Sequence, residues 1–170
     1  MIKFEKFFKS IGIKKCQIVL DFGCGSGNYT IPVAKIVGAN GLVYAVDKDK
    51  NILNKLKSRA ESEGLKNIKI INTGGGTKIK LDDKSVDVVL LYDVFHDYYF
   101  YYDERKILLS EIYRISKPNA LVSVYPTHME LEKVKGELEK IGFHFVGKCV
   151  GKFIHHNDIE EGFVLNFRSV

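Results

Sequence analysis

The sequence predicts an α/β protein of the Rossmann-like, doubly wound class, with a seven-stranded, mostly parallel sheet and an antiparallel C-terminal hairpin at one edge. Three observations predict this fold. Short apolar segments alternate with amphipathic helical segments along the chain. The first apolar segment runs directly into a glycine-rich turn. The last two strand-like segments have no helix between them, so they most simply pair antiparallel.

Length and composition indicate one domain spanning residues 1–170. The chain is 45% hydrophobic, holds only three prolines and has no linker-like stretch. No apolar run is long enough for a membrane span. Three cysteines without a CxxC pair exclude a disulfide scaffold and a zinc ribbon, so we expect a reducing, cytoplasmic setting. The net charge is +5, but only four of the 26 basic residues are arginine, which favours a polyanionic partner only weakly.

The first half of the chain predicts three helices and three strands. Phe4, Phe7, Phe8 and Ile11 recur at helical spacing, which predicts an amphipathic helix within residues 1–15. Apolar runs and helix-capping signals then predict, in order, a strand at Gln17–Asp21, a helix at about Asn28–Val37, a strand at Gly41–Asp47, a helix from Asp49 to Gly64 and a strand at Asn67–Asn72.

The second half begins with a continuous apolar strand, Val86–Tyr92, as expected for a strand buried on both faces of a parallel sheet. Crossover helices should cover both of those faces. Thr127 and Glu130 have the spacing of a capping box for a helix that ends near Ile141. The other predicted elements are a helix at Asp103–Ile115 and strands at Ala120–Tyr125, Phe143–Gly151 and Gly162–Arg168, the last two joined by the polar loop HHNDIEE.

The glycine-rich turn, VLDFGCGSGNYT, lies between a strand and a helix, where backbone N–H groups approach a ligand. A dinucleotide-binding GxGxxG motif would need glycine where the chain has Asn28, and no Gly-Lys-Ser/Thr follows for a P-loop. Asp21 stands at the strand end, which suits a ligand that carries a positive charge. The spacing therefore disfavours a nicotinamide-dependent oxidoreductase.

The pattern D-x-G-x-G-x-G after an apolar strand resembles the first motif of the class I S-adenosylmethionine-dependent methyltransferases. Four further features resemble that family: Asp47 at the end of the second strand, the segment VDVVLLYDVFH, the segment RISKPNALVSV and the closing hairpin. The resemblance covers nearly the whole chain. It is closest to the small-molecule branch (methyltransferase domain type 11), which includes quinone-pathway enzymes.

The resemblance implies that S-adenosylmethionine binds at the glycine turn, with the helix of residues 1–15 over the cleft. Asp21 would neutralise the ammonium group and Asp47 would accept both ribose hydroxyls. Without a ligand, Asp47 would be a helix cap and Asp21 would accept loop N–H groups. Gly75 stands where many relatives have an acid that holds the adenine amino group, so that contact is missing. The implied cofactor-binding residues are Asp21, Gly23, Gly25, Gly27, Asp47, Lys48, Gly75, Gly76 and Asp93.

The segment Tyr92–Tyr102 contains seven aromatic residues and follows the fourth strand. We expect either an acceptor pocket with rings near the sulfonium or a packed lid or subunit interface. If the acceptor must lose a proton, the candidate catalytic residues are His96, His128 and Tyr98. His155 and His156 precede Asp158, but adjacent residues of an extended chain point to opposite sides, so no metal site is expected.

These features predict a methyltransferase that moves a methyl group from S-adenosylmethionine to a small-molecule acceptor. The base-amine motif Asp/Asn-Pro-Pro-Tyr is absent, since Tyr92-Asp93-Val94-Phe95 stands in its place. An RNA or protein acceptor stays open, as does a non-catalytic S-adenosylmethionine-binding subunit, which the missing acid at Gly75 favours slightly. A homodimer also stays open.

Overall fold

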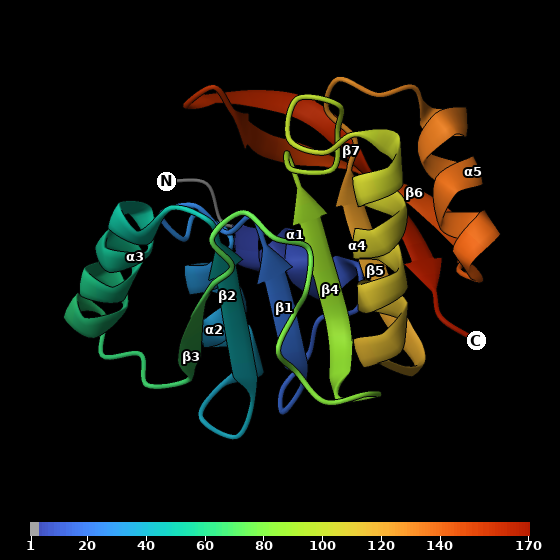
Figure 1. Ribbon diagram of the computed structural model, residues 1–170. Helices are drawn as coiled ribbons and strands as arrows, with labels where there is room; N and C mark the ends of the chain where they lie inside the picture. The colour runs from blue at the N-terminus through green and yellow to red at the C-terminus, as the bar shows by residue number, and fades with distance from the viewer. Residues whose placement is uncertain (1–3) are drawn as a thin grey trace.

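The computed structural model describes residues 4–170, which form one seven-stranded sheet in the order β3-β2-β1-β4-β5-β7-β6 (Figure 1). The first five strands in that order are parallel, and β7 runs antiparallel to both β5 and β6, which confirms the predicted fold class. In chain order the elements are α1 (Phe4–Ser10), β1 (Ile18–Phe22), α2 (Thr30–Val37), β2 (Leu42–Asp47), α3 (Lys50–Ser62), β3 (Ile68–Asn72), β4 (Val86–Tyr92), α4 (Tyr102–Ile115), β5 (Ser116–Tyr125), α5 (Leu131–Ile141), β6 (His144–His155) and β7 (Asp158–Arg168).

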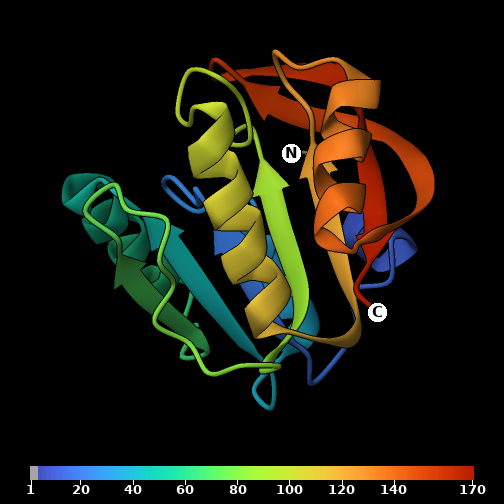
Figure 2. The same cartoon turned by 45° about the vertical axis from the view of Figure 1, so that its right-hand side comes forward.

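Helices cover the two faces of the sheet in two groups, and β4 is buried between them. Val88 and Leu90 of β4 pack with α1 and α2, whereas Val89 and Leu91 pack with α4 and α5. Helix α3 lies on the same side as α2, through Leu56 and its neighbours. Figure 2 shows α4 and α5 in front of the sheet. Burial on both faces therefore explains the continuous apolar run of β4, as predicted.

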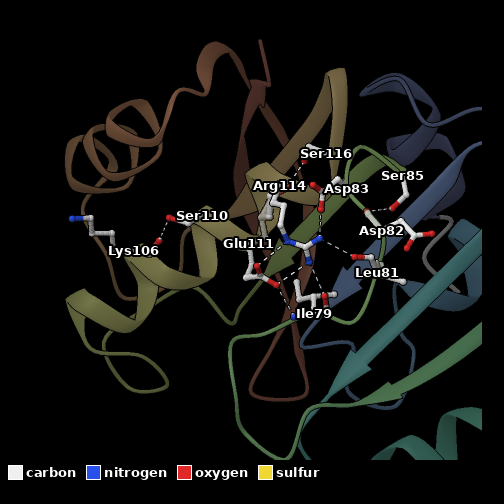
Figure 3. Close-up of polar contacts among 11 residues, drawn as sticks. Ile79, Leu81, Asp82, Asp83, Ser85, Lys106, Ser110, Glu111, Arg114 and Ser116 are labelled. Carbon is white, nitrogen blue, oxygen red and sulfur yellow. Dashed lines mark hydrogen bonds and ion pairs between the residues drawn. The ribbon is translucent and has the colours of Figure 1, made fainter.

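The connection between β3 and β4 is an exception to the predicted cover, because residues 73–85 form no helix. Arg114 of α4 holds this segment instead. Its guanidinium donates to the backbone oxygens of Ile79 and Leu81, each at 2.9 Å, and to the carboxylates of Glu111 and Asp83 (Figure 3). The sheet face beside β2 and β3 is left with a hollow of about 470 Å³.

The C-terminal hairpin is longer and tighter than predicted. His155 and Asp158 are paired residues of β6 and β7, so only His156 and Asn157 form the turn. Both have positive φ, 49° and 68°, which matches the twist of a two-residue hairpin turn. The prediction of a polar loop HHNDIEE is therefore wrong, since Asp158 and the residues after it continue the strand pairing.

The predicted capping box at the start of α5 is also wrong. The Thr127 hydroxyl donates to Asp93 Oδ1 at 2.5 Å instead of capping the helix. Helix α5 starts after Glu130, which makes no side-chain cap bond. The predicted cap of α3 is confirmed, because the Asp49 carboxylate accepts from the backbone N–H groups at the helix start. Thr127 differs because a tertiary partner competes for its hydroxyl.

Helix α1 packs on α2 and on the hairpin. Phe8 is fully buried, and the ring of Phe7 meets Phe153 of β6 edge-on at 5.1 Å. The first three residues of the predicted helical range lie outside those described, and the placement of this helix over a cofactor cleft stays a prediction. None of the helices within residues 4–170 is both long and apolar enough to cross a membrane.

Candidate functional site

The predicted site residues lie at the carboxyl edge of the sheet, around β1. This strand has β2 on one side and β4 on the other, so the chain order reverses there (Figure 1). Open α/β sheets bind ligands at such a switch point. The loops that follow β1, β2 and β4 carry the glycine turn, the end of β2 and the aromatic segment of residues 92–102.

Two of the three motif glycines are required by packing within the protein. A Cβ atom on Gly23 would lie 2.6 Å from a methyl group of Val94, and one on Gly27 would lie 2.2 Å from Leu56. Both glycines also have positive φ. Gly25 also has positive φ, +52°, but it differs because a Cβ there would have nothing within 4 Å among residues 4–170. Gly25 is therefore the glycine that borders open space.

Asp47 is presented at the end of β2 by two backbone donors. Its Oδ2 accepts from the N–H of Gly25 at 3.0 Å, and its Oδ1 accepts from the N–H of Asp49 at 2.9 Å. Each carboxylate oxygen thus keeps a lone pair for a further donor. The cap of α3 is Asp49, so the alternative in which Asp47 caps that helix is wrong.

Asp21 is a buried acid, and no cationic side chain within residues 4–170 forms an ion pair with it. Its carboxyl group is 1% exposed, and its Oδ2 accepts one hydrogen bond, from Thr30 Oγ1 at 2.6 Å. Burial raises the pKa of Asp21 to about 6; the Thr30 bond opposes the shift and nearby Asp47 adds to it. A ligand cation beside this carboxylate would find uncompensated negative charge.

The loop after β3 presents backbone rather than side chains. Gly75 has φ +95° and no atom within 4 Å of a Cβ position, and the N–H of Gly76 donates to the oxygen of Thr73 at 3.1 Å. Lys48 lies beside this loop, where its backbone oxygen accepts from Asn72 at 3.0 Å. Its ammonium group is 5.2 Å from the ring centroid of Tyr99, which links the end of β2 to the aromatic segment.

The aromatic segment is partly packed and partly open. Phe95 and Phe100 are buried in the core, whereas Tyr98 and Tyr101 are nearly four-fifths exposed. Arg105, which sequence reasoning missed, fixes the packed part. Its guanidinium is fully buried and binds Phe100 O, the Asp97 carboxylate and, through two nitrogens, the Glu137 carboxylate of α5.

His96 is buried, and one of its ring nitrogens already accepts a hydrogen bond. Nδ1 accepts from the N–H of Tyr98 at 3.3 Å, and Nε2 lies 3.8 Å from Asp93 Oδ1. This pattern assigns the proton to Nε2. Burial lowers the pKa of His96 and the nearby Asp93 charge partly opposes this, so the ring is neutral at pH 7. To accept a proton, the ring would first have to release the Tyr98 bond.

His128 is exposed and belongs to a second group of histidines. Its Nε2 lies 3.0 Å from His155 Nε2, and its ring meets Tyr98 edge-on at 5.1 Å. Sequence reasoning did not join His128 to His155, because the extended hairpin strands that bring them together were predicted as a loop. The two histidines border a hollow of about 240 Å³, also lined by Tyr125, Thr127, Glu160 and Phe163.

Comparison with known proteins identifies a matching family model and curated relatives. A family model described as "Methyltransferase domain" matches residues 19–119. A demethylmenaquinone methyltransferase of Staphylococcus aureus (strain MRSA252) is 28% identical over 148 residues, which are 87% of this chain and 58% of that protein. The chain thus spans less than two thirds of the length of that curated relative.

Among solved structures, an S-adenosylmethionine-dependent methyltransferase from Aquifex aeolicus superimposes with a TM-score of 0.76 at 27% identity, over 98% of this chain and 89% of that one. Magnesium protoporphyrin IX methyltransferase from Synechocystis, solved with bound S-adenosylmethionine, has a TM-score of 0.70 at 16% identity, over 99% of this chain and 80% of that one. The second likeness is one of fold alone.

Proposed function

The chain belongs to the class I S-adenosylmethionine-dependent methyltransferases, and from this premise we propose that it transfers a methyl group from S-adenosylmethionine to a small-molecule acceptor. The observation that carries the proposal is the pairing of Gly25 with Asp47. An open space at Gly25 adjoins a carboxylate whose two oxygens are held by backbone N–H groups and keep free lone pairs.

The residues present fit the cofactor that the family uses. Gly25 leaves room for a ligand against the backbone, Asp47 can accept hydrogen bonds from two hydroxyl groups, and Asp21 offers a buried negative charge. At the adenine position, Gly75 offers only its backbone. When bound, S-adenosylmethionine supplies a methyl group that its sulfonium centre already activates.

The work left to the protein is alignment and exclusion of water. We propose that Asp21 holds the ammonium group of the cofactor and that Asp47 holds its ribose hydroxyls. The glycine turn lets the cofactor lie against the backbone. Lys48, Gly76 and Asp93 complete the proposed cofactor wall. Gly23 and Gly27 act indirectly, because they let Val94 and Leu56 support the turn.

The proposed acceptor is a small molecule with an aromatic ring that enters beside β4 and β5. Two observations support this class. The relative from Staphylococcus aureus is named for a demethylated quinone, and the hollow beside His128 is small, at about 240 Å³. Of the candidate bases His96, His128 and Tyr98, His128 is the one that lines this hollow.

The cofactor half of the proposal is tested by titration with S-adenosylhomocysteine, using Asp47→Asn and Asp49→Asn as a matched pair. Both variants remove one negative charge within two residues, but asparagine still caps α3 in place of Asp49. We expect Asp47→Asn to weaken binding by about 1.5–3 kcal/mol, the value of hydrogen bonds to a charged group. Equal affinities for the two variants would contradict the proposed site.

The acceptor half needs a transfer assay with labelled S-adenosylmethionine, offered demethylmenaquinone, smaller phenols, RNA and protein in parallel. Label in a small molecule supports the proposal. Label in RNA or protein would contradict the proposed small-molecule acceptor and identify a macromolecule as the acceptor instead. Tight S-adenosylhomocysteine binding without transfer to any acceptor would favour a non-catalytic cofactor-binding subunit.

A further inference from the structure

Three histidines from two separate segments converge at the edge of the small hollow. His128 follows β5, His155 ends β6 and His156 begins the hairpin turn. One ring nitrogen of each lies within 4.8 Å of the others. The rings of His155 and His156 stack at 4.0 Å between centroids, and His128 meets His155 at 4.9 Å. Imidazole nitrogens gathered in this way are the usual ligands of divalent transition metals.

The turn explains why sequence reasoning predicted no metal site here. Adjacent histidines point to opposite sides only if both are extended, but His156 has φ 49° and leaves the strand. Left-handed backbone is unusually dense at this place. Seven non-glycine residues among 4–170 have positive φ, and four of them are Asp93, His128, His156 and Asn157. Those of His156 and Asn157 belong to the two-residue turn, whereas those of Asp93 and His128 are of the strained kind that tends to gather at functional sites.

The spacing of one donor pair is close to what a tetrahedral ion needs. Two nitrogens that bind one Zn²⁺ ion, each at about 2.0–2.1 Å, lie roughly 3.3 Å apart. The Nε2 atoms of His128 and His155 are 3.0 Å apart, so a small outward movement would admit an ion between them. Asp93 Oδ1 lies 3.9 Å from His155 Nε2, which keeps negative charge beside the position.

A carboxylate behind His155 orients its ring. His155 Nδ1 lies 3.2 Å from Glu160 Oε1, and the same oxygen accepts from the Tyr125 hydroxyl at 2.5 Å. A histidine that donates Nδ1–H to a carboxylate has its Nε2 lone pair free on the other side of the ring. This arrangement is typical of metal-binding histidines. Here Nε2 faces His128.

We propose that His128, His155 and His156 bind one divalent transition-metal ion of the Zn²⁺ type, with an open coordination position toward the hollow. Three nitrogen ligands and one open position are typical of zinc sites that bind a substrate or water. If the proposed function holds, an oxygen atom of the acceptor would occupy that position and the ion would stabilise its anionic form, with the proton released to solvent. His128 would then be a ligand rather than a base.

The test is a titration of the full chain, without any histidine tag, with Co²⁺ followed by visible absorption and then displacement by Zn²⁺. We expect one Co²⁺ per chain with tetrahedral bands. His128→Ala, His155→Ala and His156→Ala should each lower the affinity at least tenfold. His144→Ala, at the far end of β6, is the matched control and should bind as the wild type does. Glu160→Gln should lower the affinity about 10–100-fold, because a carboxylate that orients a metal-binding histidine contributes to metal affinity.

Two results would overturn the proposal: no cobalt bands with excess Co²⁺, or bands that persist unchanged in the three histidine variants. His128 and His156 are exposed, so their variants should fold, and melting curves in EDTA check this. Zn²⁺ should raise the melting temperature of the wild type but not of these variants. The metal titration contains neither cofactor nor acceptor. Metal binding can therefore fail while S-adenosylhomocysteine still binds, and S-adenosylhomocysteine binding can fail while the metal still binds.

Discussion

Helix α4 carries two arginines that each hold one loop of the candidate site, and the two differ in burial. Arg105 holds the aromatic segment after β4, and Arg114 holds the segment between β3 and β4. Both bind a glutamate through two nitrogens, an aspartate and main-chain oxygen. The Arg105 side chain is 0% exposed, whereas that of Arg114 is 33% exposed.

The same set of bonds therefore has different consequences in the two places. Around Arg114, water can replace a lost partner, and exposed ion pairs contribute little to stability. Glu137, the partner of Arg105, is only 8% exposed, so its charge cannot be rehydrated if the arginine is removed. We infer that the proposed acceptor side of the site depends on a buried ion pair and the proposed adenine side on a solvated network.

The largest expected effect is that of Arg105→Ala. Removing one partner of a buried pair costs about 3–5 kcal/mol, and for a chain of this size each kcal/mol lowers the melting temperature by about 2–4 °C. Urea and thermal unfolding measure the loss. The double variant Arg105→Met, Glu137→Leu should recover most of it, because no charge is then left unpaired. If Arg105→Ala were as stable as the wild type, burial would not distinguish the two arginines in their contribution to stability.

Asp21 sharpens the comparison, because it is a buried acid with no arginine. Burial raises its pKa from the ordinary 3.8 to about 6, so the folded protein binds this proton more tightly than the unfolded chain does. The free energy of unfolding should therefore fall as pH rises through this window, by about 1–2 kcal/mol between pH 5 and pH 7.5.

Asp21→Asn should remove this pH dependence and raise stability at pH 7.5, while weakening S-adenosylhomocysteine binding. Urea unfolding at the two pH values, with and without the ligand, measures both effects. A pH dependence that persists in Asp21→Asn would assign it to other groups.

Arg114→Ala should have a smaller effect, about 1 kcal/mol, because its partners are partly solvated. The loss should shrink further in high salt, which screens exposed pairs more than buried ones. Residues 73–85 should become more mobile, and hydrogen exchange of their amides reports this directly. A loss as large as that of Arg105→Ala would show that burial does not separate the two networks.

The last comparison concerns ligand affinity rather than stability, and it uses an acid added to the loop that Arg114 holds. At Gly75, φ is +95°, so an aspartate there would meet backbone strain that offsets a new bond to adenine. Gly76 has no such φ. We expect Gly76→Asp to tighten S-adenosylhomocysteine binding up to tenfold, or about 1.4 kcal/mol, and Gly75→Asp to change it less. Calorimetry on both variants makes the comparison.

The strand order and the cofactor motif could be predicted because both depend on residues that are close together in the sequence. Asp21, Gly25 and Asp47 lie within or next to strands whose apolar pattern is clear, and their neighbours in space follow from the parallel order. The hydrogen bond from Gly25 to Asp47 is a consequence of that order.

The acceptor side could not be predicted in the same way, because its partners are set by contacts between distant segments. Thr127 has the spacing of a helix cap, but Asp93 takes its hydroxyl. The polar segment from Asp158 to Glu161 is typical of a loop, yet its pairing with β6 makes it part of a strand. Arg105 gave no sequence signal, since its partner Glu137 lies on another helix.

The two-residue turn at His156 and Asn157 also bears on how the chain folds. It lets β6 and β7 meet by closing a very short loop, whereas the pairing of Val19 in β1 with Val88 in β4 must close a long one. Long loops cost more entropy before contacts compensate for it. We expect amides of the hairpin to gain protection before those of β1 in pulsed hydrogen exchange. His155 and His156 would then be neighbours early in folding, and His128 would join them only when β5 docks against β7.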